Sequence, residues 1–280
     1  MSYPVYIAKP IPLRPQKCKL LTRAIAGVKE ESTVPGMTAW LDTLKYDAHD
    51  LVTAVCQHVD TGEVLMLAYC DRAALNETMQ TGKATFYSRS RQERWCKGET
   101  SGNYLRVTGV YADCDRDALI FLCDPLGPSC HTGARTCWFE QARLDEDGNL
   151  LVGGESTDPG HVPRTSLLAL EHTILERAQA NTSAASSGTI SEKPSWTARL
   201  LADPKLACKK IREEAGELCE TWEKEEGRER TVSEAADLLY HAMALLRTQD
   251  VAAEEVLAEL RRRFGVSGIE EKASRGPRKA

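Results

Sequence analysis

The sequence predicts a multidomain protein of mixed α and β structure, with a β-rich α+β N-terminal domain followed by an all-α helical bundle. Two observations carry this prediction. Apolar, β-branched runs separated by turn residues dominate residues 51–123, whereas leucine-rich segments at helical spacing dominate residues 166–264. A length of 280 residues allows one large domain or two ordinary ones, each with a core of its own.

The expected elements of the first half are mostly strands. Residues 51–70 (LVTAVCQHVDTGEVLMLAYC) predict two strands around the turn Asp60-Thr61-Gly62. A short helix is expected at 71–80, and further strands at 83–91, 103–112 and 117–123.

The second half is expected to be helical. Leucines and isoleucine at helical spacing predict a helix over 166–179, and further helices are expected near 196–203, 205–225, 231–247 and 251–264. The polar, small residues of 180–195 predict a flexible loop. The expected divisions are a leader at 1–38, a first domain at 39–150, a linker at 151–165, a second domain at 166–265 and a tail at 266–280.

Composition excludes several classes of protein. Hydrophobic residues make up 42% and charged residues 28%, as in soluble globular proteins, and a net charge of −5 argues against broad nucleic-acid binding. We expect no membrane span, because no apolar run approaches the roughly 20 residues that one needs.

Residues 1–29 hold six Lys or Arg and no acid, which indicates an organelle transit peptide or, alternatively, a disordered basic tail. With no secretory apolar segment, the ten cysteines are expected to be reduced thiols.

Three cysteines form a candidate metal site. Cys114, Cys130 and Cys137 are separated by fifteen and then six residues, and they contain no CxxC spacing of the kind that zinc fingers use. Three thiolates suit zinc and leave one position open for water, which is the mark of a catalytic centre. The alternative is that these three cysteines are buried core residues. A fourth cysteine, Cys123 inside ALIFLC, is expected to be a core residue of that kind.

Asp113, Asp115 and Asp117 alternate, so in a strand their carboxylates would project from one face. Their mutual repulsion predicts a bound cation, and oxygen ligands favour Mg²⁺. A solvated acidic turn is the alternative.

The segment SRSRQERWCKGETSGN (88–103) is a candidate phosphate-binding loop. Cations, hydroxyl groups and glycines can approach phosphate oxygens closely, and Trp95 could cover an aromatic base. An ordinary solvated loop is the alternative. The candidate substrate-binding residues are Ser88, Arg89, Arg91, Trp95, Lys97, Gly98, Thr100, Ser101 and Gly102.

Two helices of the second half carry a second set of acids. In KKIREEAGELCETW (209–222) an apolar seam is expected, formed by Ile211, Ala215, Leu218 and Trp222. Antiparallel packing of this helix on SEAADLLYHAMALL (233–246) would gather five carboxylates around Mg²⁺, although surface glutamates are usually only solvated. These five are Glu213, Glu214, Glu217, Glu234 and Asp237.

The ordered motifs SRSRxxxWxKGxTSGN, DCDxDAL and GPxCHTGxxxC, over residues 42–140, resemble phosphoribosyl-AMP cyclohydrolase. The resemblance implies opening of the N1–C6 bond of the adenine ring. It implies zinc on the three cysteines, with ligands shared across a homodimer, and Mg²⁺ on the three aspartates. We interpret His131 as a general base or proton shuttle, or alternatively as a residue that orients a ligand.

The pattern EExxE followed by ExxD is similar to all-helical nucleotide pyrophosphohydrolases, and residues 166–264 resemble phosphoribosyl-ATP pyrophosphatase, with Trp196 where that family more often has Tyr. Arg199, Lys209 and Lys210 are candidate phosphate contacts, with helix-surface solvation as the alternative for each.

Together the halves resemble the bifunctional enzymes of histidine biosynthesis, and the basic leader and the ending SGIEEKASR resemble plant-type members of plastids. A cytoplasmic location is the alternative. Two other functions stay open: a zinc-stabilised binding module fused to a helical dimerisation domain, and a general nucleotide-cleaning pyrophosphohydrolase.

Overall fold

The computed structural model describes residues 36–140, 142–144, 147–152, 164–187 and 195–264. Most of the predicted leader, the boundary segment 153–163 and the tail 266–280 lie outside these residues. The chain divides into two compact units. The first comprises the chain up to Gln57 together with Met66–Ser129, and the second comprises His58–Leu65 together with the chain from Cys130 onward.

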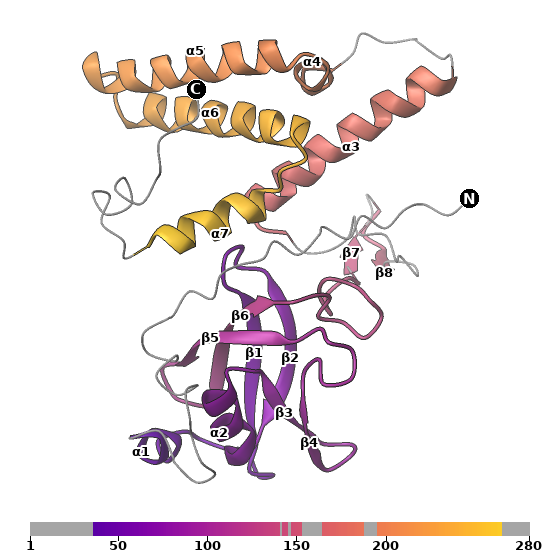
Figure 1. Cartoon of the computed structure of the whole chain (residues 1–280), viewed down its shortest axis with the longest axis vertical. Helices are drawn as coiled ribbons and strands as arrows, with labels where there is room; N and C mark the ends of the chain where they lie inside the picture. Colours follow the sequence, from indigo (N-terminus) through magenta and orange to yellow (C-terminus); the bar gives the residue numbers. More distant parts are fainter. Residues whose placement is uncertain (1–35, 141, 145–146, 153–163, 188–194, 265–280) are drawn as a thin grey trace, which may run out of the picture. The chain divides into compact units, whose positions relative to one another are not determined.

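A six-stranded sheet organises the N-terminal half, in the order β4-β3-β2-β1-β6-β5 (Figure 1). Side chains of β1 alternate between buried and half-buried, as expected for a strand with one face on the core. Phe86, Phe121 and Leu65 are among the largest fully buried side chains. The strands are β1 Val52–His58, β2 Val64–Cys70, β3 Thr85–Ser88, β4 Glu93–Cys96, β5 Leu105–Ala112 and β6 Ala118–Pro125, with helices α1 Met37–Leu41 and α2 Arg72–Thr81.

The predicted hairpin at 51–70 and the helix after it are confirmed. The predicted strand at 83–91 is shorter than expected, because the chain turns after Ser88 and returns as β4, antiparallel to β3. Asp113, Asp115 and Asp117 occupy the turn between β5 and β6, where Arg116 has a φ of 69°, so they do not project from one face of a strand.

Five helices follow the small hairpin of β7 Ala142–Leu144 and β8 Leu150–Val152. Ser195 caps α4 through the amide of Ala198, and Asp203 caps α5, which begins at Pro204. The helices are α3 Ser166–Ser187, α4 Trp196–Ala202, α5 Pro204–Glu223, α6 Arg228–Thr248 and α7 Ala253–Arg263. No helix in the described part of the chain is long and apolar enough to cross a membrane.

The expected loop at 180–195 is wrong in its first half, because α3 continues to Ser187. The alanines of ANTSAASS favour helix strongly enough to extend it. Residues 188–194 lie outside the described part.

The apolar seam expected on α5 is wrong at Trp222, which is 84% exposed, whereas Ile211, Ala215 and Leu218 are half-buried. The buried positions of the helix are Ala207, Glu214 and Thr221. The buried face of α5 therefore carries a carboxylate, because its partner is the acidic face of α6. The two helices lie side by side (Figure 1) and are joined by a short turn, so they run antiparallel.

Candidate metal centres

Three carboxylates converge between α5 and α6. Oxygens of Glu214, Glu234 and Asp237 lie within 4.8 Å of one another, and the first two side chains are buried. Glu234 has one oxygen, Oε2, without a hydrogen-bond partner. A buried carboxylate oxygen that lacks a donor is costly unless a cation neutralises it. The donor set therefore fits a hard divalent ion such as Mg²⁺.

The other two predicted carboxylates lie at the rim of this cluster. Glu213 pairs with Lys210 at 2.9 Å, and this hydrogen bond lowers the pKa of Glu213. Lys210 also reaches Glu214 at 2.8 Å, and the two carboxylates raise the pKa of its ammonium group. Glu217 faces Arg230 at 3.5 Å. Lys209 and Arg199 are exposed, and the Arg199 guanidinium lies 5.0 Å from the ring centre of Trp196.

Arg230 and His241 contact this cluster and were missed by sequence reasoning. Arg230 donates to Glu234 Oε1 at 2.6 Å, and burial together with Glu217 raises the pKa of Glu234. His241 is buried, with Nδ1 2.8 Å from the Asp237 carbonyl oxygen, and its Nε2 accepts from the Trp196 indole at 3.4 Å. The position of His241 one turn after Asp237 was the available signal.

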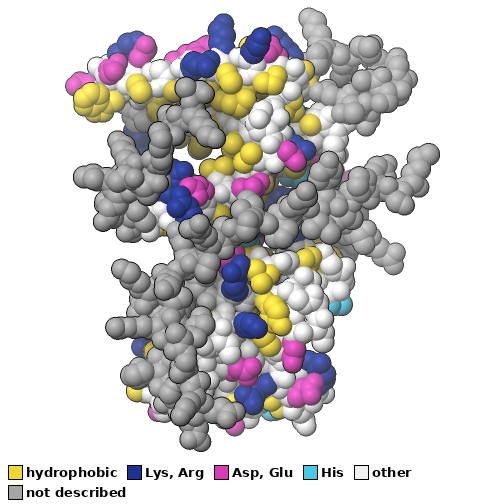
Figure 2. Space-filling model, in the orientation of Figure 1, with side chains coloured by type: hydrophobic (Ala, Val, Ile, Leu, Met, Phe, Trp, Pro, Cys, Tyr) yellow, Lys and Arg dark blue, Asp and Glu magenta, His cyan; other side chains and the backbone are white. Residues whose placement is uncertain are grey.

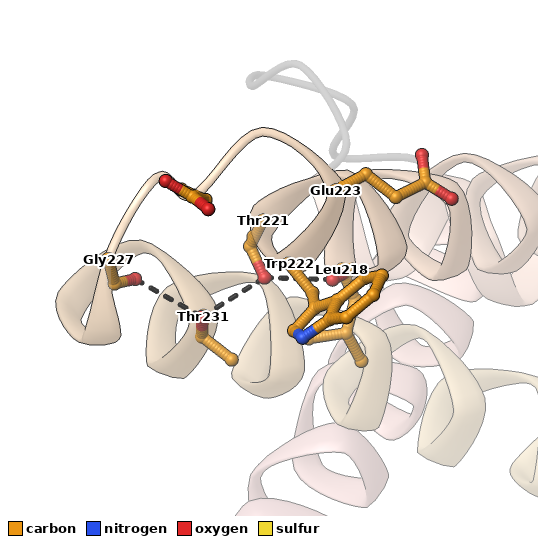
Figure 3. Close-up of a pocket in the computed structure, with 7 residues that line it drawn as sticks. Leu218, Thr221, Trp222, Glu223, Gly227 and Thr231 are labelled. Carbon is orange, nitrogen blue, oxygen red and sulfur yellow. Dashed lines mark hydrogen bonds between the residues drawn. The ribbon is translucent and has the colours of Figure 1, made fainter.

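A hollow of about 570 Å³ lies by the α5–α6 turn, at the end of this helix pair (Figure 3). Thr231 donates to the hydroxyl of Thr221 at 3.0 Å, and Thr221 donates to the Leu218 carbonyl at 2.8 Å. No predicted site residue lines this hollow. In the space-filling view, Lys and Arg side chains lie beside Asp and Glu along the upper helices (Figure 2).

The β5–β6 turn forms a second acidic group. Carboxylate oxygens of Asp113, Asp115 and Asp117 lie within 4.8 Å of one another, and all three residues are exposed. Asp113 Oδ1 accepts from the amides of Asp117 and Ala118 at 3.1 and 3.2 Å. The negative charge of Asp115 raises the pKa of Asp117. A hard cation at this turn would relieve that repulsion, so the donor set fits Mg²⁺.

Two of the three candidate zinc thiols, Cys130 and Cys137, interact with each other in the second unit. Burial opposes ionisation of Cys130, but hydrogen bonds from Thr132, Cys137 and the local backbone outweigh it and lower the pKa of this thiol. The Thr132 hydroxyl lies 3.1 Å from Cys130 Sγ, and His131 Nδ1 lies 3.9 Å from it. A thiol whose ionisation is favoured, beside a second thiol, suits zinc. Cys114 is exposed and belongs to the first unit, whereas Cys123 is fully buried, as predicted.

The candidate phosphate-binding segment spans β3, β4 and the turns that follow them. Gly98 has a φ of 90°, and an added Cβ would lie 2.4 Å from the Asn103 carbonyl carbon. Lys97 is buried and donates to the carbonyls of Asn103 and Pro128 at 3.0 and 3.4 Å. These two residues therefore shape the loop that follows β4.

The exposed members of this segment have local partners. The Arg89 guanidinium lies 3.8 Å from the ring centre of Tyr69, and Arg91 pairs with Glu93 at 3.2 Å. Trp95 packs on Phe86 with ring centres 5.2 Å apart. The small residues Ser88, Thr100, Ser101 and Gly102 lie at the end of β3 and in the turn after β4. Phosphate binding by this segment stays a prediction.

Comparison with known proteins matches two family models to this chain: phosphoribosyl-AMP cyclohydrolase over residues 66–139 and phosphoribosyl-ATP pyrophosphohydrolase over residues 186–264. The chain is 44% identical over 278 residues to the chloroplastic histidine biosynthesis bifunctional protein hisIE of Arabidopsis thaliana, covering 96% of this chain and 93% of the relative. It is 37% identical to the bifunctional protein of Wolinella succinogenes, covering 85% and 99%. It is also 58% identical over 97 residues to a phosphoribosyl-AMP cyclohydrolase of Erythrobacter litoralis, covering 35% and 78%.

Proposed function

The chain belongs to the family of bifunctional histidine-biosynthesis enzymes that join a phosphoribosyl-AMP cyclohydrolase to a phosphoribosyl-ATP pyrophosphohydrolase, and from this we propose that it catalyses both reactions at separate metal centres. The helical half hydrolyses phosphoribosyl-ATP to phosphoribosyl-AMP and pyrophosphate. The strand-rich half then hydrolyses the N1–C6 bond of the adenine ring. The observation that carries the proposal is that each matched region holds its own set of metal-type ligands.

In the helical half, Glu214, Glu234 and Asp237 would hold Mg²⁺, with Glu213 and Glu217 at the rim. Bound Mg²⁺ supplies charge neutralisation for the substrate phosphates and a site for the attacking water. Lys210 and Arg199, with Lys209, are the cations that would contact the phosphates. His241 holds the backbone of Asp237 through its carbonyl oxygen and so fixes the position of that carboxylate.

In the strand-rich half, Cys130 and Cys137 would hold zinc together with Cys114, and we propose that the ligands are shared between two copies of the chain. Bound zinc supplies a water whose pKa is lowered towards about 7. His131 lies beside Cys130 and would accept the proton of the water that attacks adenine C6. Asp113, Asp115 and Asp117 would hold Mg²⁺, and the residues of 88–102 would bind the ribose phosphate and the base.

We also propose that the protein acts in the plastid, as the relative from Arabidopsis thaliana is named chloroplastic. The acid-free sequence of residues 1–29 supports this location, because transit peptides are poor in acids.

A two-step assay on the purified chain tests the function. Phosphoribosyl-ATP is supplied, and pyrophosphate release and ring opening are followed separately, together with zinc content. We expect both products and bound zinc. Hydrolysis of ordinary nucleoside triphosphates at a matching rate would instead indicate a general pyrophosphohydrolase, and bound zinc without turnover would indicate a binding module.

A further inference from the structure

The loop that carries Cys130 and Cys137 is attached to the β1–β2 turn, residues 58–65, within the second unit. The Cys137 amide donates to the Leu65 carbonyl at 2.8 Å. The Thr136 hydroxyl, which is buried, lies 2.7 Å from the Val64 carbonyl oxygen and 3.1 Å from that of Leu65. These bonds fix the end of the loop at Thr136 and Cys137, but they leave residues 131–135 to be positioned.

Arg135 lies inside that spacer and contacts two carboxylates. Its Nη2 and Nε donate to Glu63 Oε2 at 2.6 and 2.8 Å, and its Nη1 donates to Glu254 Oε2 at 2.7 Å. The Glu63 side chain is only 4% exposed and also accepts from the Thr61 hydroxyl at 3.0 Å. A planar guanidinium held at three of its nitrogens has a fixed orientation, which a flexible ammonium group could not reproduce.

The second carboxylate, Glu254, is itself held in place. His58 is buried, and its Nδ1 accepts from the amides of Asp60 and Thr61 at 3.1 and 3.3 Å. The proton of the neutral ring therefore lies on Nε2, which donates to Glu254 Oε1 at 2.9 Å. Glu254 thus has one oxygen on His58 and the other on Arg135, and both partners of the arginine are fixed.

We propose that Arg135 is a positioning residue for zinc: by anchoring the spacer to Glu63 and Glu254, it holds Cys130 and Cys137 at the separation that the metal requires. The inference rests on the proposed zinc site. A spacer fixed before binding lowers the conformational entropy that zinc binding must otherwise overcome. Groups that orient metal ligands typically contribute about 10- to 100-fold to metal affinity.

The test is the zinc dissociation constant of the full-length chain, measured by competition with a chromophoric chelator. Arg135→Gln removes both the positive charge and the planar guanidinium. Arg135→Lys keeps the charge but not the guanidinium, and Glu63→Gln removes the negative charge of the arginine's partner. Arg72→Gln is the matched control, because Arg72 makes an exposed pair with Asp42. We expect about 10- to 100-fold weaker zinc binding for Arg135→Gln, an intermediate loss for Arg135→Lys and Glu63→Gln, and a change within about twofold for Arg72→Gln.

Circular dichroism on each metal-free variant establishes that the chain is folded. If Arg135→Gln does not fold, Arg135→Lys and Glu63→Gln decide the question by the same measurement. Folded variants that bind zinc as tightly as the wild type would overturn the inference. If the wild type itself binds no zinc, or binds it equally well after Cys130→Ser, the proposed zinc site fails instead, so the two failures are distinguishable.

Discussion

At the scale of the residue, the proposed proton acceptor of the strand-rich half is His131. It is exposed and lies next to Cys130, so it can reach a substrate without displacing a packed neighbour. Replacing it with Asn keeps a hydrogen-bonding group of similar reach but removes the base. We expect His131→Asn to lower the ring-opening rate by about 10²- to 10⁴-fold with zinc still bound. Near-normal turnover of phosphoribosyl-AMP by the zinc-loaded variant would show that His131 is not the proton acceptor.

Gly98 and Gly102 form a matched pair of loop glycines. Both have positive φ, at 90° and 76°, but a Cβ on Gly98 would meet the Asn103 backbone at 2.4 Å, whereas one on Gly102 would meet nothing within 4 Å. Both substitutions to Ala carry backbone strain, and only Gly98→Ala adds a collision. We expect Gly98→Ala to destabilise the protein by at least about 2 kcal/mol more than Gly102→Ala. Equal thermal unfolding midpoints for the two variants would contradict this.

The ionisation of Glu254 makes the free energy of unfolding depend on pH. Burial opposes its ionisation, but the hydrogen bond from His58 and the charge of Arg135 prevail and lower the pKa of Glu254 to about 2. A lowered pKa in the folded state contributes stability above the unfolded-state pKa, near 4.3, and this contribution is lost as the pH falls towards 2. With its side chain about one-third exposed, the contribution at pH 7 is on the order of 1–3 kcal/mol.

We therefore expect Glu254→Gln to lower the urea midpoint at pH 7 and to have less than half that effect on stability at pH 3. A loss of the same size at both pH values would mean that the charge of Glu254 does not stabilise the fold.

At the scale of the element, the antiparallel pair α5–α6 brings together carboxylates that the sequence places 20 or more residues apart. Glu234→Gln keeps the size of the side chain and an acceptor for Arg230, but removes the charge that a cation needs. Adding Mg²⁺ should raise the thermal midpoint of the wild type and of the control Glu220→Gln, whose carboxylate pairs with Lys224 at the surface. The Mg²⁺-dependent shift should be smaller in Glu234→Gln, because only the proposed site of Asp113, Asp115 and Asp117 would remain. An undiminished shift in that variant would exclude Glu234 as a ligand.

Periodicity predicted most of the elements correctly, because strands and helices with one buried face carry their own pattern of apolar residues. It did not predict β4, since ERWC shows no alternation and its pairing with β3 is a tertiary contact. It did not decide the conformation of Asp113, Asp115 and Asp117, because a turn and a strand can both direct alternate carboxylates to one place. It also mispredicted part of the buried face of α5, where Trp222 is exposed and Glu214 is buried. Apolar periodicity cannot identify a buried face that packs against the acidic residues of another helix.

Residue types and spacing predicted the candidate metal ligands, because few side chains serve as metal ligands and they occur in short motifs; the structure brings members of both predicted acidic sets together. The contacts of Arg135 and Lys97 could not be predicted in the same way, because their partners lie in other segments of the chain. A basic residue in a loop has no local signal that distinguishes a buried ion pair from a solvated charge. Arg230 and Glu234 lie four residues apart in α6, so their spacing was a local signal.

At the scale of the whole molecule, two reactions share one chain while their ligand sets lie in separately matched regions. The two proposed ligand sets share no residue, so we expect each reaction to survive the loss of the other metal. Joining the two activities in one chain keeps them at equal abundance.

The most direct measurement is the two-step assay on a pair of variants, Cys130→Ser and Asp237→Asn. We expect Cys130→Ser to release pyrophosphate from phosphoribosyl-ATP at the wild-type rate without opening the ring. We expect Asp237→Asn to release no pyrophosphate but to open the ring of supplied phosphoribosyl-AMP. Loss of both reactions in either soluble variant would contradict two independent centres.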